Sequence, residues 1–201
     1  MNKINKLHPI HKVYDGIFNS CSGVQVSLKE PTAKMIVLQD IAVSLNNICR
    51  FGGQIPEFYS VLQHSLLVYA LAPKELAGVA LLHDATEGYL GDVIKPLKVI
   101  LDYSYSDIEK RFQKAIFERF SLDESLMSAI KRYDTQALQM EHDYFFNIRK
   151  SPLKHILDMF KPDVERRSPF IVDTDWVKIY KDLVYENCPN LLNDELIGGA
   201  I

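Results

Sequence analysis

Apolar residues recur at spacings of three and four along successive segments of this chain. In the first clear case Leu38, Ile41, Leu45 and Ile48 share one face of a helix that begins near residue 38. Similar stripes run through residues 60–72, 74–87, 106–120, 123–146 and 175–186, and a short helix fits residues 153–160. This periodicity predicts an all-α fold in which each helix buries one face.

Turn-forming residues and capping signals mark the boundaries of these segments. Gly52-Gly53 and Pro73 end helices, Ser60 is a candidate N-cap, and residues 106–109 have the form of a capping box. The segment around residues 88–98 is expected to be a turn-rich loop.

The chain is expected to form one domain over residues 1–201, because no repeat or low-complexity tract divides it. Its core is expected at about 35–187, after an irregular segment 1–34 that has at most a brief strand at 24–28. A proline-rich loop is expected at 150–170, and a fraying tail at 188–201.

Composition excludes several classes of protein. Lysine and arginine number 23 against 26 acidic residues, so the net charge of −3 argues against a polymer-binding basic coat, and we expect no nucleic-acid polymer as partner. No apolar stretch approaches the ~20 residues that span a bilayer, so we expect no membrane association. The first residues contain no uninterrupted apolar stretch, so we expect no secretory signal, and the 3 cysteines form no paired motif. We therefore expect a cytoplasmic protein.

Polar residues interrupt three of the apolar stripes. His64 precedes Leu67 and Val68 by three and four residues, His83 follows Ala80 and Val79 at the same spacings, and Asp134 lies four residues from both Ile130 and Leu138. A carboxylate on an apolar face costs several kcal/mol (about 3–5) unless it is compensated. A divalent cation would compensate these groups together, because imidazole and carboxylate are both good ligands. Asp84 adds a fourth potential ligand, and a helix would bring Glu87 to the same side.

Each of these residues also has an ordinary structural interpretation. A single histidine on an apolar stripe is usually a hydrogen-bonded core residue, and Asp134 could pair with Arg132. A His-Asp dipeptide is a weak signal, since about one chain in two of this composition would contain such a dipeptide by chance. The chain has a second such pair, His142-Asp143, which we interpret as a solvent-exposed pair that takes no part in the site.

The order of these residues is that of a known superfamily. A histidine, a His-Asp pair and a distant aspartate define the HD-domain phosphohydrolases. The segments LLHDATEGYLGDVIKPLK (81–98) and QDIAVSLNNICRFGGQIPEFYSVLQHS (39–65) further resemble the YfbR-type deoxynucleotide 5′-nucleotidases and phage-type HD hydrolases, including the DatZ-type dATP triphosphohydrolases. The resemblance spans about residues 35–145 and implies an HD-domain helical bundle.

The resemblance also implies roles for individual residues. A divalent metal ion (Mn, Co, Fe, Zn or Mg) would be held by four ligands: His64, His83, Asp84 and Asp134. Glu87 would be the catalytic acid or base, and Asp92 a second catalytic carboxylate.

Three further residues are candidates for substrate binding. Arg50 matches the family's arginine near sugar and phosphate, although a surface salt bridge is its ordinary alternative. Phe51 replaces the family's tryptophan and could stack on a base or simply pack. Lys95 could meet a phosphate tail or remain solvated. Gln63 stands where YfbR-type enzymes have glutamate, so substrate preference does not transfer directly.

The implied function is metal-dependent hydrolysis of small (deoxy)nucleotides, with attack of activated water on phosphorus and release of phosphate or of di- or triphosphate. An HD-type phosphodiesterase and a nucleotide-binding regulatory module without turnover stay open as alternatives. The resemblance is also compatible with a homodimer or a larger homo-oligomer.

Overall fold

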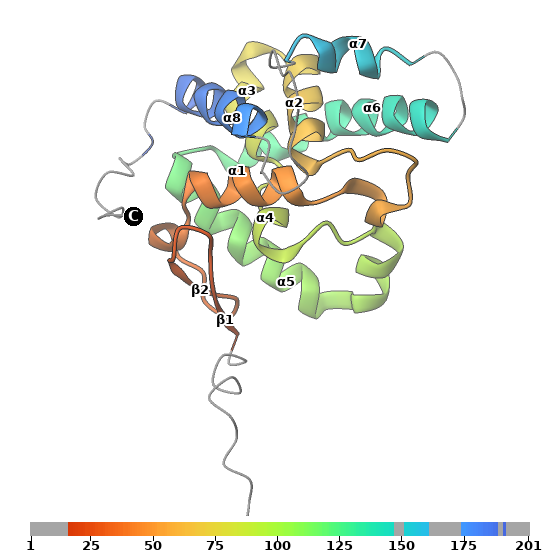
Figure 1. The fold of residues 1–201 in the computed structure, drawn as a ribbon. Helices are drawn as coiled ribbons and strands as arrows, with labels where there is room; N and C mark the ends of the chain where they lie inside the picture. The colour runs from red at the N-terminus through yellow and green to blue at the C-terminus, as the bar shows by residue number, and fades with distance from the viewer. Residues whose placement is uncertain (1–15, 147–150, 161–173, 189–190, 192–201) are drawn as a thin grey trace, which may run out of the picture.

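The computed structural model describes residues 16–146, 151–160, 174–188 and 191. These residues form an all-α bundle with one small sheet, so the predicted fold class is confirmed (Figure 1). The α-helices are α1 (Leu38–Asn47), α2 (Val61–Leu71), α3 (Ala77–Leu82), α4 (Glu87–Leu90), α5 (Lys95–Phe120), α6 (Met127–Phe145), α7 (Leu153–Asp158) and α8 (Thr174–Asn187). Short 3₁₀ turns are η2 (Ala33–Met35), η3 (Arg50–Gly53), η4 (Lys74–Leu76) and η5 (Glu124–Leu126).

Helix α2 is the centre of the bundle. It packs against α1, α3, α6, α7 and α8, and Figure 1 shows it enclosed by these neighbours. Accordingly its apolar residues are spread around the helix instead of forming one stripe, as expected for a helix covered on all sides. Its buried residues are Val61, Leu62, His64, Ser65, Leu66, Leu67 and Val68.

The start of α2 is fixed by a capping box, as Ser60 predicts. The backbone N–H of Gln63 donates to Ser60 Oγ (3.2 Å), and the backbone N–H of Ser60 donates to Gln63 Oε1 (2.8 Å). Glutamine and glutamate fill this capping position equally well, which accounts for Gln63 in structural terms. An isolated bridge between Cys49 and Ser60 then holds the segment before η3 against the start of α2.

Residues 16–34 are more regular than expected. Strands β1 (Ile17–Asn19) and β2 (Gln25–Ser27) pair antiparallel, and Val26 is fully buried in the core. Asp40 of α1 fastens this hairpin, because its carboxylate accepts hydrogen bonds from the backbone N–H and the hydroxyl of Ser22. The strand predicted at 24–28 is present, whereas β1 has too short an apolar pattern to be recognised alone.

Two predicted helix boundaries are wrong. The helix expected over 74–87 ends at Leu82, and residues 83–86 form turns before α4. The capping box expected at 106–109 lies inside α5, which begins at Lys95. The turn-rich loop expected at 88–98 therefore ends earlier than expected. Pro96 lies in the first turn of α5, where proline is tolerated because no intrahelical bond needs its missing N–H.

The remaining segments agree with expectation as far as they are described. The short helix expected within 153–160 is α7. Residues 150 and 161–170 of the predicted proline-rich loop lie outside the described residues, as do residues 1–15 of the irregular segment and most of the expected tail. Within the described part of the chain, the helices are all too short or too polar to cross a bilayer.

Packing of α3 against the end of α8 predicts a sensitive glycine. A Cβ on Gly78 would lie 2.9 Å from the backbone oxygen of Asn187 and 3.1 Å from Cys188 Sγ. We expect Gly78→Ala to lower the free energy of unfolding by about 1–3 kcal/mol because the two helices must separate. Urea unfolding measures this change.

The matched control is Gly88→Ala in α4, where the nearest atom to an added Cβ is 3.4 Å away. That variant should have near-native stability. Equal stability of Gly78→Ala and the unsubstituted protein would contradict the packing of α3 on α8.

Candidate metal centre

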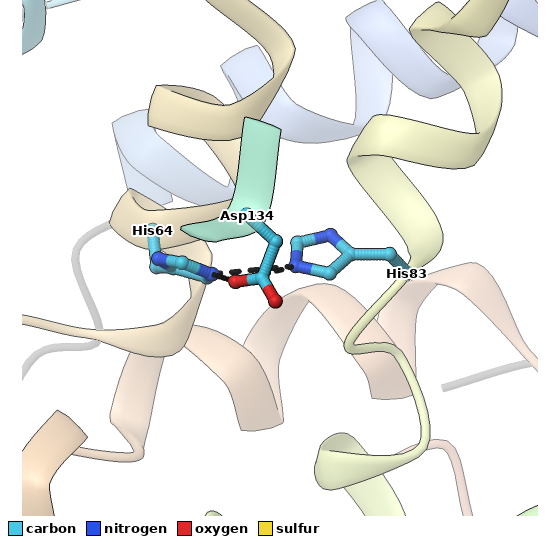
Figure 2. A group of neighbouring side chains, drawn as sticks. All are labelled: His64, His83 and Asp134. Carbon is cyan, nitrogen blue, oxygen red and sulfur yellow. Dashed lines mark hydrogen bonds and ion pairs between the residues drawn. The ribbon is translucent and has the colours of Figure 1, made fainter. Parts of the chain in front are cut away.

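Two imidazoles and a carboxylate from three parts of the chain lie close together in the bundle. His64 lies on α2, His83 ends α3 and Asp134 lies on α6, and their potential ligand atoms are all within 4.8 Å of one another. His64 Nε2 is 3.3 Å from His83 Nε2 and 3.2 Å from Asp134 Oδ1. Figure 2 shows the two rings facing each other with the Asp134 carboxylate beside the gap between them.

The carboxylate of Asp84 completes this group. Its Oδ2 lies 3.5 Å from His64 Nε2 and 3.3 Å from His83 Nε2. His83 and Asp84 occupy the tightened turn after α3, so two adjacent residues both reach the same point. The structure therefore brings together all four residues that the sequence identifies as candidate ligands.

Hydrogen bonds fix which nitrogen of each ring faces the centre. The carbonyl oxygen of Ala80 can only accept, so Nδ1 of His83 must donate to it over 2.8 Å. Nδ1 of His64 lies 2.5 Å from Glu141 Oε1 and donates to that carboxylate. In the neutral tautomers that result, both Nε2 atoms present a lone pair to the centre, as metal ligands require.

The charges around the centre leave a negative excess. Burial acts to raise the pKa values of Asp84, Asp134 and Glu141, but the imidazoles outweigh burial and hold all three below their usual range. The pKa of Arg50 lies above its usual value, since Glu141 and Asp84 outweigh the effect of its burial. When His64 is protonated, three carboxylates face one guanidinium and one imidazolium, which leaves one unbalanced negative charge. When both imidazoles are neutral the excess is two, which is the charge that a divalent cation would neutralise.

His64 responds to the same excess. Its burial and the nearby Arg50 act to lower its pKa, but the Glu141 and Asp134 carboxylates raise that pKa to about 9. The centre thus attracts a positive charge, which a proton on His64 supplies when no cation does. The donor set, its tautomers and its charge together fit a divalent metal ion.

Glu141 is the functional residue that the sequence interpretation missed. It is fully buried, and its carboxylate accepts hydrogen bonds from His64, from the Tyr59 hydroxyl (2.9 Å) and from Arg50 Nη2 (3.0 Å). It lies seven residues after Asp134, two helical turns along the same face of α6. This spacing could have indicated Glu141 as a residue of the same site. The segment around it, which includes His142-Asp143, is polar and therefore resembles an exposed helix face.

Arg50 lies beside the centre, and one of its guanidinium nitrogens, Nη2, donates a hydrogen bond to Glu141. Its Nη1 is 3.7 Å from Asp84 Oδ2, while its Nε is buried without a partner among the described residues. The next residue, Phe51, has φ +57°, a left-handed conformation that is unfavourable for a bulky side chain. Phe51 packs edge-on against Phe145 and Phe146 and lies 5.4 Å from the Arg50 guanidinium.

Glu87 and Asp92 lie beyond the ligands on the α4 side. Burial, together with the Asp84 and Asp92 carboxylates, raises the pKa of Glu87 well above its usual value. Burial and Asp84 likewise raise the pKa of Asp92, although Arg50 opposes them. Lys98 reaches Glu87 Oε1 at 3.5 Å, whereas Oε2 of Glu87 is buried without a partner in the described chain. Lys95 is exposed at the start of α5, so Lys98 is the lysine that faces the centre.

Relatives with known sequences share much of this chain. Over 155 residues, 71% of this chain and 78% of the relative, it is 34% identical to uncharacterized protein RCAP_rcc00048 of Rhodobacter capsulatus. It is also 44% identical over 106 residues to uncharacterized protein YfdR of Escherichia coli K12, a match that spans only 59% of YfdR. No model of a known protein family matches the chain. The chain belongs to the same family as RCAP_rcc00048, and neither relative's name states an activity.

The Glu141–His64 contact yields a prediction about metal affinity. Glu141→Gln keeps the size of the side chain but removes the charge that orients and polarises His64. We expect the affinity for Mn²⁺, measured by isothermal titration calorimetry, to fall about 10- to 100-fold.

Asp143→Asn is the matched control on the same helix, because Asp143 contacts Gln139 on α6. It should bind Mn²⁺ as the unsubstituted protein does. Unchanged affinity in Glu141→Gln, with an unchanged melting temperature, would contradict the role given to Glu141.

Proposed function

We propose that this protein is an HD-type metal-dependent phosphohydrolase that acts on small (deoxy)nucleotides. The observation that carries the proposal is the convergence of His64, His83 and Asp134, whose potential ligand atoms all lie within 4.8 Å of one another, with the Asp84 carboxylate against both imidazoles. The resemblance of segments 39–65 and 81–98 to HD nucleotidases supplies the reaction class.

The four proposed ligands would hold a cation that takes part in the reaction. When bound, a divalent cation lowers the pKa of water and neutralises charge on a phosphate group. The ligand atoms come from three separate elements, and the Nε2 atoms are oriented by bonds to Ala80 and Glu141. The chain therefore supplies a preorganised site that needs no rearrangement of its imidazoles.

Arg50 is the proposed phosphate-binding group. Its Nη2 is held by Glu141, which fixes the plane of the guanidinium, and its Nε is buried and unpaired among the described residues. An unpaired buried donor costs about 1–3 kcal/mol, and a phosphate oxygen would satisfy it. Phe51 beside it could contact a sugar or base. Lys95, the other candidate from the sequence, is exposed at the start of α5 and does not face the centre, so we give it no role in phosphate binding.

Glu87 and Asp92 are the proposed proton carriers. Burial and the neighbouring Asp84 and Asp92 carboxylates raise the pKa of Glu87, which favours the protonated carboxyl group and so suits donation of a proton to a leaving oxygen. Lys98 holds one oxygen of Glu87 and leaves the other free. Asp92 is half-buried in the segment before α5, where it can accept the proton that an attacking water loses.

A substrate panel tests the proposed activity. Purified protein with Mn²⁺ or Co²⁺ should release phosphate or polyphosphate from at least one deoxynucleoside mono- or triphosphate, and EDTA should abolish the release. Absence of turnover on every nucleotide of the panel, in protein shown to contain metal, would contradict the proposal. Two tightly bound metals per chain with turnover of cyclic nucleotides would favour the phosphodiesterase alternative.

A pair of variants separates metal binding from proton transfer. We expect Glu87→Ala to retain the metal but lose about 10²- to 10⁴-fold in kcat, because it removes a proton carrier. Asp84→Ala should lose both metal and turnover, because it removes a ligand. Metal content by mass spectrometry and initial rates measure the two effects.

Two results would contradict these assignments. Equal metal content in Asp84→Ala and the unsubstituted protein would contradict the ligand assignment. Full turnover in Glu87→Ala would contradict the proton-carrier assignment and leave the metal assignment intact.

A further inference from the structure

Helix α5 carries a network of charged and aromatic side chains that extends outward from Glu87. Nζ of Lys98 lies 3.5 Å from Oε1 of Glu87 but only 2.8 Å from Oε1 of Glu109. The ring of Tyr105 lies against the same ammonium group, with its centroid 5.7 Å from Nζ. Lys98 is therefore held by two residues of its own helix, Tyr105 and Glu109, and meets Glu87 from that position.

The contact between Lys98 and Glu109 requires α5 to bend. The two residues are eleven positions apart on one helix, and eleven residues of straight helix rise by about 16.5 Å. That rise exceeds the combined reach of an extended lysine and an extended glutamate side chain. Figure 1 shows the first turns of α5 set at an angle to the remainder of the helix. The Lys98–Glu109 ion pair spans this bend.

Glu109 lies where the firmly packed part of α5 begins. Phe112 and Ile116 are fully buried in the core, whereas Val99 and Ile100, next to Lys98, are 74% and 77% exposed. Apolar packing therefore fixes the second half of the helix much more firmly than its first turns. The ion pair supplies a restraint on the first turns that packing does not.

The ammonium group of Lys98 keeps its charge in this network. Burial acts to lower its pKa, but the hydrogen bond to Glu109 and the charge of Glu87 outweigh burial and hold that pKa above its usual value. Removal of the Glu109 charge would leave Glu87 as the remaining ion-pair partner of Lys98 in the described chain. The ammonium group would then move toward Glu87 and displace its carboxylate.

We propose that Glu109 is a positioning residue for the proton carrier Glu87 and acts on it through Lys98. The short bond to Glu109 fixes the ammonium group beside Oε1 of Glu87. Oε2 of Glu87, which is buried and unpaired among the described residues, then stays available to the substrate. This inference rests on the role of Glu87 in the proposed function, whereas the Lys98–Glu109 contact stands without it.

Steady-state kinetics test the role of Glu109, with Mn²⁺ and the panel nucleotide that the unsubstituted protein hydrolyses fastest. Glu109→Gln keeps the size of the side chain and should lower kcat about 10- to 100-fold, because it displaces a proton carrier. KM and metal content should each change less than about twofold. The matched control is Glu118→Gln, which alters an exposed glutamate on the same helix and should retain full kcat. A fall in kcat matched by an equal loss of metal or of helical circular dichroism would indicate a structural role and overturn the proposal.

A double variant tests whether Glu109 acts through Lys98. Lys98→Met should also lower kcat, because it releases Oε1 of Glu87. The addition of Glu109→Gln to Lys98→Met should change kcat by less than about twofold, since the group through which Glu109 acts is already absent. Losses that multiply in the double variant would overturn this path.

The contact itself has a readout that needs no turnover. In ¹⁵N-labelled protein at low temperature, the Lys98 ammonium group should give a resolved ¹H–¹⁵N signal, because its contacts slow exchange of its protons with water. The signal is assigned by its loss in Lys98→Met, and it should disappear in Glu109→Gln and persist in Glu118→Gln. A signal that is absent from the unsubstituted protein, or that survives Glu109→Gln, would overturn the contact.

Failure of this inference and failure of the proposed function give different results. Turnover that Glu109→Gln leaves unchanged would overturn the positioning role alone. An unsubstituted protein that hydrolyses no nucleotide of the panel would overturn the proposed function and the positioning role with it, even where the ammonium signal shows the contact to be present.

Discussion

The contact between Glu141 and Nδ1 of His64 is the interaction on which the rest of the centre depends. It places a proton on the nitrogen that faces away from the centre and leaves Nε2 free to coordinate. The same carboxylate holds Arg50 and Tyr59, so one residue sets the position of the candidate phosphate-binding group and orients a candidate metal ligand. Metal and phosphate would thus be bound by one hydrogen-bonded unit and not by two independent sites.

The fold gives these buried polar groups the partners that they need. His64 and Glu141 are fully buried, and unpaired charge at that depth would be strongly destabilising. Helix α2 carries His64 into the middle of the bundle, and its capping box and the Cys49–Ser60 bridge fix where the helix starts. Local signals at the start of the helix therefore determine the position of His64 in the core.

The helices and the candidate ligands were predictable from the sequence for different reasons. Apolar periodicity located α1, α6 and α8, because each buries one face. The apolar residues of α2 surround the helix, so its high apolar content and the Ser60 cap are the better signals there. The ligands stood out because His64, His83 and Asp134 are polar residues on apolar stripes. The start of α5 was missed because its first turns bury little, and Pro96 had two valid interpretations. Glu141 was missed because its partners, Arg50 and Tyr59, are more than 80 residues away in sequence, and only the tertiary fold brings them together.

The central claim is that one cation is held by four side chains at the junction of α2, α3 and α6. A crystal grown with Mn²⁺ and measured at a wavelength that gives manganese anomalous scattering tests this most directly. The account predicts a single strong anomalous peak about 2.0–2.3 Å from Nε2 of His64, Nε2 of His83 and a carboxylate oxygen of each aspartate, Asp84 and Asp134. A peak elsewhere, or no peak with the four side chains hydrogen-bonded only to one another, would contradict it.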